Sequence, residues 1–384
     1  MNRLVLIGGG HAHLFVLERL AQVRLAHTEV LLVTPGRWQY YSGMIPGWMT
    51  GDYTLEECRI DLQALADAAG VCLIPEAMVG MDASQGYIEL SNGQQVSYDL
   101  LSLDTGSETD CQWLAALDER LILVKPLPDF LKAWRAMVES ALRKNRPRLV
   151  VVGGGAAGAE LAMAANYRLR QMNDQSEVML VTGEGGLLPN FGAESRRRLS
   201  HALLGAGVEI VQERAVGHEK GLLLESGKII HADWVIAATG ARAPAWLAGS
   251  QLELDPQGFI VVDRYHRSTS HSRVFAAGDV CSRTDSVLGR SGVHAVRVGP
   301  ILGKNLIAAL EGKPMKAYTP ARRTLSLLTC GGRRAVGAWG RWGVEGQWVW
   351  RWKDFIDRRF VRQFSGKAKS TVSDTQYCRG ISWF

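Results

Sequence analysis

Apolar and polar positions follow the same order at two places in the chain. Residues 3–21 read RLVLIGGGHAHLFVLERLA, and residues 148–169 read RLVVVGGGAAGAELAMAANYRL. Each stretch begins with a short, uniformly apolar run, which is typical of a parallel strand buried on both faces. Three glycines follow, and then apolar residues at helical spacing. The pattern predicts a strand, a tight turn and a helix at both places.

The glycines of these turns match the dinucleotide fingerprint G-x-G-x-x-G. The second turn matches it fully at Gly153, Gly155 and Gly158, whereas the first has Gly8 and Gly10 with His13 in third position. The first glycine permits the turn, the second lets the backbone approach a pyrophosphate, and the third allows close helix–strand packing. The helix that follows offers free N–H groups to the phosphates. Two such units predict an α/β fold with two Rossmann-like, nucleotide-binding domains.

Two histidines, His11 and His13, follow the first glycine turn. They lie where phosphates bind rather than beside other metal ligands, so we expect no metal site. We expect His13 to push the helix slightly away from the strand, because it replaces a glycine. The six cysteines form no CxxC or CxxxxC pair, which argues against a zinc knuckle and a local redox disulfide.

The residues after the second strand of each unit bear on the nucleotide. A Rossmann unit usually has an acidic residue there that binds the ribose hydroxyls. Here the positions hold Thr34 in the first unit and Thr182 in the second, with Glu184 two residues further on. No arginine follows Thr182 closely, so the sequence favours NADH over NADPH.

The charge of the chain is uneven. Residues 313–384 contain 15 Lys and Arg against 4 Asp and Glu, a balance of +11, whereas the rest of the chain has a balance of −5. Five tryptophans at 339, 342, 348, 350 and 352 precede KDFIDRRFVRQF at 353–364. At helical spacing, Phe355, Ile356, Phe360 and Phe364 share one face and basic residues line the rest, which is typical of an interfacial membrane helix. A helix that packs on the protein itself is the alternative, and the two can coexist.

No segment is long and apolar enough for a signal peptide or a membrane span. We therefore expect a cytoplasmic protein, with peripheral attachment to the inner face of the membrane as an open alternative. No nucleic-acid-binding module is recognisable, so we expect no nucleic-acid partner.

Three further motifs resemble those of flavoproteins with two dinucleotide-binding domains. VFAAGDV at 274–280 is similar to their second FAD fingerprint, and SYDLLSLDTGS at 97–107 and ADWVIAATGAR at 232–242 are similar to their paired crossover strands. The resemblance implies FAD in the first lobe and NAD(P)H in the second. It divides the chain into an FAD domain at 1–117 and 242–325, an NAD(P)H domain at 118–241, and a C-terminal segment at 326–384 that faces the membrane or acceptor.

Within this group, the chain resembles type II NADH dehydrogenases and sulfide:quinone oxidoreductases. The similarity lies in YYSGMIPGWMTGDYTLEECRIDL at 40–62 and GVHAVRVGP at 292–300, and no CxxxxC of the disulfide reductases follows the first helix. GGGHAH, YYSGM, AVRVGP and WKDFIDRRF most resemble a branch of FAD-containing NADH-dehydrogenase-like proteins. Members of that branch also occur fused to selenide, water dikinase, but we expect no kinase domain here.

The resemblance implies a set of cofactor-binding residues. The ADP half of FAD would lie along Gly8, Gly10, His11 and Thr34, with Val79 at the adenine and Thr105 and Gly106 at the ribose. The ring would be approached by Met44 and Pro46, the ribityl chain by Gly278 and Asp279, and the pyrimidine edge by Val293, His294 and Ala295. The nicotinamide nucleotide would contact Gly153, Gly155, Gly158, Thr182, Glu184 and Gly240.

Four residues are candidates for catalysis. Glu160 resembles the glutamate that faces nicotinamide and flavin in type II dehydrogenases, where a carboxylate could relay protons; the alternative is an ordinary surface glutamate. Lys125 and Lys353 could lie near the flavin as cations, or be solvated. Cys330 is the fourth, with Cys111 or Cys281 as its partner, since sulfide:quinone oxidoreductases use two cysteines; buried structural thiols are the alternative.

The resemblance implies an oxidoreductase that passes a hydride from NAD(P)H to FAD and electrons to a quinone or similar small acceptor. Two alternatives stay open: an enzyme that oxidises sulfide or thiols, and a partner-dependent flavoprotein linked to selenium metabolism. A homodimer is also compatible with the sequence.

Overall fold

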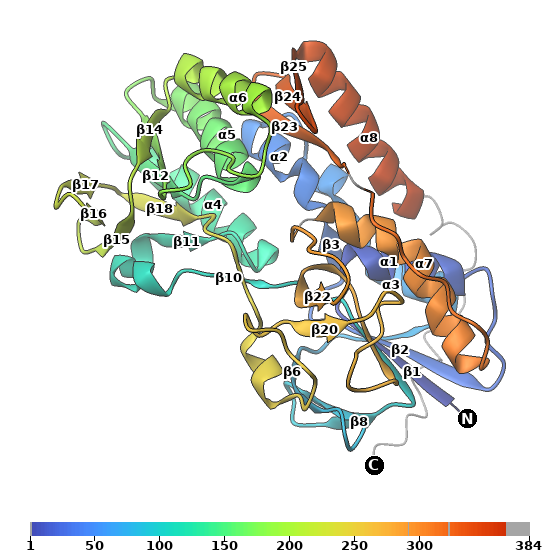
Figure 1. The fold of residues 1–384 in the computed structure, drawn as a ribbon. Helices are drawn as coiled ribbons and strands as arrows, with labels where there is room; N and C mark the ends of the chain where they lie inside the picture. The colour runs from blue at the N-terminus through green and yellow to red at the C-terminus, as the bar shows by residue number, and fades with distance from the viewer. Residues whose placement is uncertain (1, 291, 322, 366–384) are drawn as a thin grey trace.

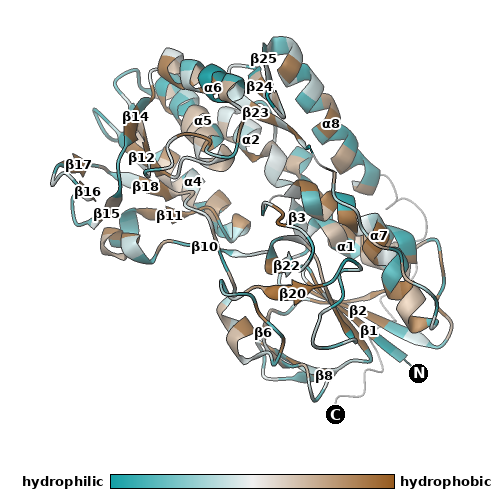
Figure 2. Cartoon of the chain, in the orientation of Figure 1, coloured by the Kyte–Doolittle hydropathy of each residue, from teal (hydrophilic) through white to brown (hydrophobic). Residues whose placement is uncertain are grey.

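The computed structural model describes residues 2–290, 292–321 and 323–365 (Figure 1). Two five-stranded parallel sheets form its two lobes, and a smaller C-terminal part lies against both. The α/β class with two Rossmann-like cores is therefore confirmed. Figure 2 shows the central strands of both sheets in hydrophobic colours, as expected for strands covered on two faces.

The first sheet has the strand order β21-β9-β1-β2-β5. These strands are β1 (Asn2–Ile7), β2 (Thr28–Val33), β5 (Cys72–Ile74), β9 (Leu100–Leu103) and β21 (Val274–Ala276). Helices α1 (His11–Leu20), α3 (Leu62–Ala69) and α7 (Gly292–Leu310) cover one face. The other face is covered by the meander of β6 (Met78–Asp82), β7 (Tyr87–Leu90) and β8 (Gln95–Ser97). In β1, for example, Leu4 and Leu6 pack toward the helices while Val5 and Ile7 pack toward the meander.

The second sheet repeats this plan in the order β11-β18-β12-β13-β14. Its strands are β11 (Leu121–Leu123), β12 (Arg148–Val152), β13 (Glu177–Thr182), β14 (Glu209–Gln212) and β18 (Trp234–Ala237). Its helices are α4 (Leu127–Ala141), α5 (Ala156–Met172) and α6 (Ala193–Ala206), and its meander is β15 (Ala215–His218), β16 (Gly221–Leu224) and β17 (Ile229–His231). Both glycine repeats thus form the expected strand, turn and helix, as β1–α1 and β12–α5.

The chain leaves the first sheet after β9, builds the second sheet, and returns to the first sheet as β21. The outgoing and returning segments pair antiparallel as β10 (Glu108–Thr109) and β19 (Ala241–Arg242). Short elements complete this region: η3 (Gln112–Arg120), η4 (Ala245–Gly249), β20 (Ile260–Val262), η5 (Gly278–Val280) and β22 (Cys281–Arg283). The predicted domain limits remain predictions, but this path explains why the first lobe is built from two parts of the sequence.

A segment after β2 projects from the first sheet toward the second. It contains β3 (Trp38–Tyr40), η1 (Ser42–Met44), α2 (Ile45–Thr50), η2 (Glu56–Cys58) and β4 (Arg59–Asp61). Helix α2 packs against α5 of the other lobe and against the C-terminal strand β23. The segment therefore brings residues 40–62 to the junction of the lobes.

The C-terminal part consists of an antiparallel sheet and a helix: β23 (Leu325–Gly331), β24 (Arg334–Trp339), β25 (Trp342–Gly346) and α8 (Gln347–Ser365). Strand β23 packs on α5, and α8 packs on β24 and on β4 (Figure 1). This part thus rests on both lobes at their junction. No helix in the described ranges has the length and apolar character needed to cross a bilayer.

The expected faces of α8 need one correction. Phe360 and Phe364 are buried, whereas Phe355 and Ile356 are exposed, so the four side chains do not share a face. The inward aromatic residues pack on α1, where the Phe15 and Phe364 ring centroids are 5.0 Å apart. Lys353 was expected on the polar side and is instead buried. Helix α8 therefore turns Lys353, Phe360 and Phe364 toward the protein and Phe355 and Ile356 toward solvent.

Candidate functional site

The first glycine turn leaves no room for side chains. A Cβ on Gly8 would lie 2.5 Å from the carbonyl oxygen of Asp104, and one on Gly10 would lie 2.4 Å from the Asp104 carboxylate. Gly8 also has a φ of 88°, which favours glycine. The backbone N–H groups of Ala12 and His13 donate to Asp104 Oδ2 at 2.8 and 3.0 Å. The carboxylate thus fixes the start of α1 against β9, and burial raises its pKa to about 7.

The two histidines after this turn are uncharged; His13 is buried and His11 is half-buried. His13 lies between Gly8 O and Ser102 Oγ, at 2.7 Å from Nδ1 and 2.8 Å from Nε2. It is fully buried, so Ser102 and the strand accommodate the ring that replaces the third glycine. His11 packs against Tyr41 and Phe360, and burial lowers the pKa of both imidazoles to about 4.

The second glycine turn is tighter still. A Cβ on Gly153 would lie 2.1 Å from Ala238 O, and one on Gly158 would lie 1.9 Å from Gly153 O. Helix α5 begins directly after Gly155, which provides no side-chain cap. Its first N–H groups therefore point to the sheet edge, where a pyrophosphate binds in this fold.

Asp279 and Lys125 lie together at the end of the first sheet. Lys125 Nζ donates to Asp279 Oδ2 at 2.6 Å and to Ser107 Oγ at 2.8 Å. Next to Asp279, Gly278 has a φ of 71°, and a Cβ there would lie 2.6 Å from Asp104 Oδ1. Two predicted site residues thus meet beside the first glycine turn.

Helix α7 begins beside His11, because a Cβ on Gly292 would lie 3.5 Å from the His11 ring. Burial lowers the pKa of His294 in the first turn, so this imidazole is neutral. Its Nδ1 and the Nε2 of His11 are buried, and neither has a hydrogen-bond partner among the described residues. Unsatisfied buried donors or acceptors are costly, so these two nitrogens are suited to contact a bound group.

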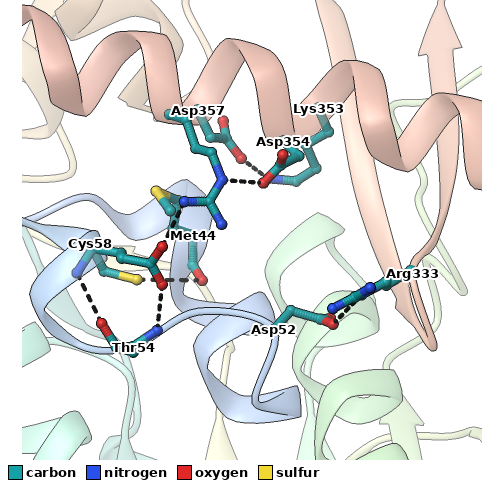
Figure 3. A network of polar contacts seen from close by, with 10 residues as sticks. Met44, Asp52, Thr54, Cys58, Arg333, Lys353, Asp354 and Asp357 are labelled. Carbon is teal, nitrogen blue, oxygen red and sulfur yellow. Dashed lines mark hydrogen bonds and ion pairs between the residues drawn. The ribbon is translucent and has the colours of Figure 1, made fainter.

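A buried charged cluster lies where the two lobes and the C-terminal part meet (Figure 3). Lys353 on α8 donates from Nζ to Gly43 O at 2.6 Å and to Asp357 Oδ2 at 2.5 Å. Tyr41 also donates a hydrogen bond to the Asp357 carboxylate. Burial alone would lower the pKa of Lys353, but Asp357 and Glu160 outweigh it and raise that pKa. Lys353 is therefore an ammonium ion inside the protein.

Glu160 completes this cluster from α5. Its Oε1 accepts a hydrogen bond from the backbone N–H of Thr329 at 2.7 Å. Burial raises its pKa to about 7, against the opposing effect of the Lys353 charge. A carboxyl group with that pKa exchanges its proton near neutral pH, as a general acid or base requires.

Cys330 follows Thr329 on β23. Burial, followed by the nearby charge of Glu160, raises the pKa of its thiol to about 12. Cys58, Cys111 and Cys281 also carry free thiols, and burial raises the pKa of each. A thiol with a raised pKa is a poor nucleophile at neutral pH.

Surface ion pairs fasten α8 and β24 over this cluster. Arg358 donates to Glu57 at 2.6 Å and to Asp354 at 2.8 Å, and Arg333 contacts Asp52 at 3.2 Å (Figure 3). The Arg358–Glu57 and Arg333–Asp52 contacts join residues that are 301 and 281 positions apart in the sequence. They hold the C-terminal part in place on the segment at 40–62.

The other predicted site residues lie at separate positions. Thr34 is buried at the end of β2, Met44 and Pro46 are buried in η1 and α2, and Val79 is 54% exposed on β6. Thr105, Gly106 and Gly240 follow β9 and β18, and the two glycines have positive φ. Val293 and Ala295 lie in the first turn of α7.

Thr182 is fully buried, whereas Glu184 is exposed and pairs with Arg214.

Sequence reasoning missed four residues of this region: Tyr41, Asp104, Arg214 and Asp357. Only Asp357 had a local signal, because it lies four residues after Lys353 on the same helix. In the described ranges, no group of three or more His, Cys, Asp or Glu could hold a metal ion.

A family model described as pyridine nucleotide-disulphide oxidoreductase matches residues 2–300. The chain belongs to this family. The oxidoreductase is 27% identical over 337 residues to an NADH dehydrogenase-like protein of Mycobacterium tuberculosis, covering 83% of each chain.

Two solved structures have the same fold. They are the sulfide:quinone oxidoreductase of Aquifex aeolicus (TM-score 0.79, 14% identity, covering 96% of this chain and 92% of that one) and NDH2 of Plasmodium falciparum in complex with NADH (TM-score 0.76, 13% identity, covering 94% and 98%). The link to selenide, water dikinase stays a prediction.

This oxidoreductase uses FAD and NAD(P)H, and the residues present fit both. Two glycine turns, in which a Cβ on Gly8, Gly10, Gly153 or Gly158 would overlap a neighbour, precede two helix N-termini. Around the first turn, the free nitrogens of His11 and His294 and the Asp279–Lys125 pair offer polar groups of the kind that bind a flavin nucleotide.

Replacing Asp279 with alanine should abolish FAD retention, because it removes the acidic group that Lys125 holds at the end of the first sheet. The measurement is the flavin-to-protein ratio after purification, with circular dichroism to check folding. Asp285→Ala is the control, since Asp285 is half-exposed and pairs with Arg283. An Asp279→Ala protein that purifies fully yellow would rule out this role.

Proposed function

We propose that this oxidoreductase is an NAD(P)H:quinone oxidoreductase. The observation that carries the proposal is the buried cluster of Lys353, Asp357 and Glu160, which joins α5, α8 and η1. Reduction of a quinone by NAD(P)H transfers two electrons and consumes one proton beyond the hydride. The protein must therefore keep an exchangeable proton near the acceptor.

Bound FAD would supply the redox chemistry by accepting a hydride and releasing electrons. The chain supplies charge and protons. Lys353 stays positively charged at neutral pH and favours negative charge that develops nearby. Glu160 holds a proton below pH 7 and can release it to a reduced acceptor.

An apolar cavity in the C-terminal part supports a quinone-like acceptor. Its volume is about 310 Å³, and it is lined by Leu325, Gly337, Trp339, Trp342, Val344, Trp348 and Trp352. Its walls are aromatic or aliphatic, as expected for a site that takes an apolar ring or tail. Trp352 lies on α8 directly before Lys353, so the same helix borders the cavity and the charged cluster.

The outer side of α8 supports docking to a membrane. Trp348 and Phe355 are 56% and 62% exposed on this side, and Arg351, Arg359 and Arg362 are exposed with them. Trp342, on the adjoining strand β25, is 63% exposed. Exposed tryptophans mixed with cations are typical of a surface that lies in a lipid interface. Quinones dissolve in bilayers, so this placement would bring the cavity to its acceptor.

The sulfide-oxidising alternative finds less support in the cysteines. It requires a reactive thiolate, whereas the pKa of Cys330 is raised to about 12. A partner-dependent flavoprotein would show no turnover alone, which the next experiment would also reveal.

Anaerobic NADH should bleach the flavin absorbance band of the purified protein, and an oxygen-free quinone should then restore it. The Cys330→Ser protein should behave in the same way, because the thiol takes no part. A protein that stays yellow with NADH, but bleaches with sulfide only when Cys330 is present, would overturn the proposal in favour of the sulfide-oxidising alternative.

Quinone reduction should fall as pH rises through about 7, because Glu160 loses its proton there. Above that pH the protonated fraction, and with it kcat, should fall about tenfold per pH unit. Glu160→Gln should be slow at every pH and lose this slope. Glu345→Gln, at a half-exposed position on β25, should keep it; an unchanged slope in Glu160→Gln would exclude Glu160 as the proton donor.

Vesicles of anionic phospholipid should bind the protein through the outer side of α8. Replacing both Trp348 and Trp352 with alanine should weaken vesicle binding by about tenfold or more, because the apolar area that the two side chains bury in the membrane is lost. The measurement is co-flotation with vesicles, and Trp113→Ala is the control, since Trp113 is 42% exposed on η3. Equal flotation of the double variant and the wild type would argue against this surface.

A further inference from the structure

The end of the second sheet carries a pair of charged residues that the proposed reaction does not use. Strands β13 and β14 are parallel neighbours, with Thr182 opposite Gln212 in the register, so their carboxyl ends meet at one edge. In this fold the adenosine ribose of a dinucleotide binds just beyond the end of the strand that follows the glycine turn and its helix, which here is β13. Glu184 follows β13 by two residues, and Arg214 follows β14 by two residues.

The two side chains meet across this edge. Arg214 Nε lies 3.0 Å from Glu184 Oε1, and their side chains are 68% and 69% exposed. Gln212 donates from Nε2 to the backbone oxygen of Glu184 at 3.3 Å, which connects the loop to β14. The loop also touches the second glycine turn, because a Cβ on Gly154 would lie 2.2 Å from Gly186 O. The charged pair is therefore joined to the turn that would hold the phosphates.

Thr182 cannot read the ribose in their place, because it is fully buried. The exposed Glu184–Arg214 ion pair contributes little net stability, since water competes for both groups. Either side chain can therefore exchange its partner for a ligand at low cost. A carboxylate accepts hydrogen bonds from ribose hydroxyls, whereas a guanidinium binds a phosphate through two parallel hydrogen bonds.

We propose that Glu184 and Arg214 together read the 2′ position of the adenosine ribose, so that the oxidoreductase accepts both NADH and NADPH. With NADH, Glu184 accepts the hydrogen bond of the 2′-hydroxyl. With NADPH, Arg214 leaves Glu184 and pairs with the 2′-phosphate. This inference rests on the proposed use of NAD(P)H and corrects the preference for NADH that the sequence suggested, because the arginine comes from the neighbouring strand.

The test is a calorimetric titration of the FAD-loaded full chain with NAD⁺ and with NADP⁺, which measures binding without turnover. The wild type should bind both, with dissociation constants within about tenfold of each other. Arg214→Ala should weaken NADP⁺ binding about tenfold or more and leave NAD⁺ binding nearly unchanged. Glu184→Gln should act in the opposite sense. It should weaken NAD⁺ binding, and it should strengthen NADP⁺ binding because it removes a carboxylate near the 2′-phosphate.

Arg148→Ala is the matched control. Arg148 pairs with Glu177 at the same distance of 3.0 Å and at intermediate exposure, but at the opposite, amino-terminal edge of the same sheet. It should leave the binding of both nucleotides unchanged.

The outcomes separate this inference from the proposed function. A wild type that binds NAD⁺ alone, or an Arg214→Ala protein that loses both nucleotides equally or neither, would overturn the inference while NAD(P)H use stands. A wild type that binds neither nucleotide would overturn both.

Discussion

The ammonium group of Lys353 lies inside the protein, and three separate parts of the chain are arranged around it. Burying a charge costs several kcal/mol unless hydrogen bonds and opposite charges replace the lost water. Gly43 O and Asp357 provide these contacts directly, and Glu160 adds a second negative charge across the junction once it has lost its proton. Helix α8 can therefore occupy its place only when η1 and α5 are in theirs. The charge thus makes the junction of the two lobes and the C-terminal part a single cooperative unit.

The first glycine turn obeys a different constraint, which is steric. Gly8, Gly10 and Gly278 all lie so close to Asp104 that a side chain on any of them would overlap it. The same carboxylate holds the first N–H groups of α1, so the turn, β9 and the start of the helix are fixed together. The turn is therefore rigid, and two of the N–H groups at the start of α1 already bind the Asp104 carboxylate.

The local units could be predicted from the sequence, whereas the contacts between them could not. Each strand, turn and helix around Gly8 and Gly153 was readable because a few adjacent residues determine it. Lys353 and Gly43 are 310 positions apart, and no local pattern connects them. Arg214 was missed for the same reason, since it meets Glu184 only because β14 lies beside β13. The faces of α8 were misassigned because helical spacing shows that apolar residues cluster but not which cluster another element covers.

Helix α8 ties the chemistry of the cluster to the surface of the protein. Trp352 and Lys353 are neighbours in sequence, and each residue turns a helix by about 100°, so one points outward while the other points inward. Rotating the helix enough to bury the exposed tryptophans would also bring the ammonium group into contact with solvent. The Arg358–Glu57 pair and the Phe15–Phe364 contact oppose such a rotation at two further points along the helix. The orientation of the outer aromatic side is therefore set by the position of the buried charge. A change that moves the buried ammonium group of Lys353 would therefore also move the outer aromatic side of α8.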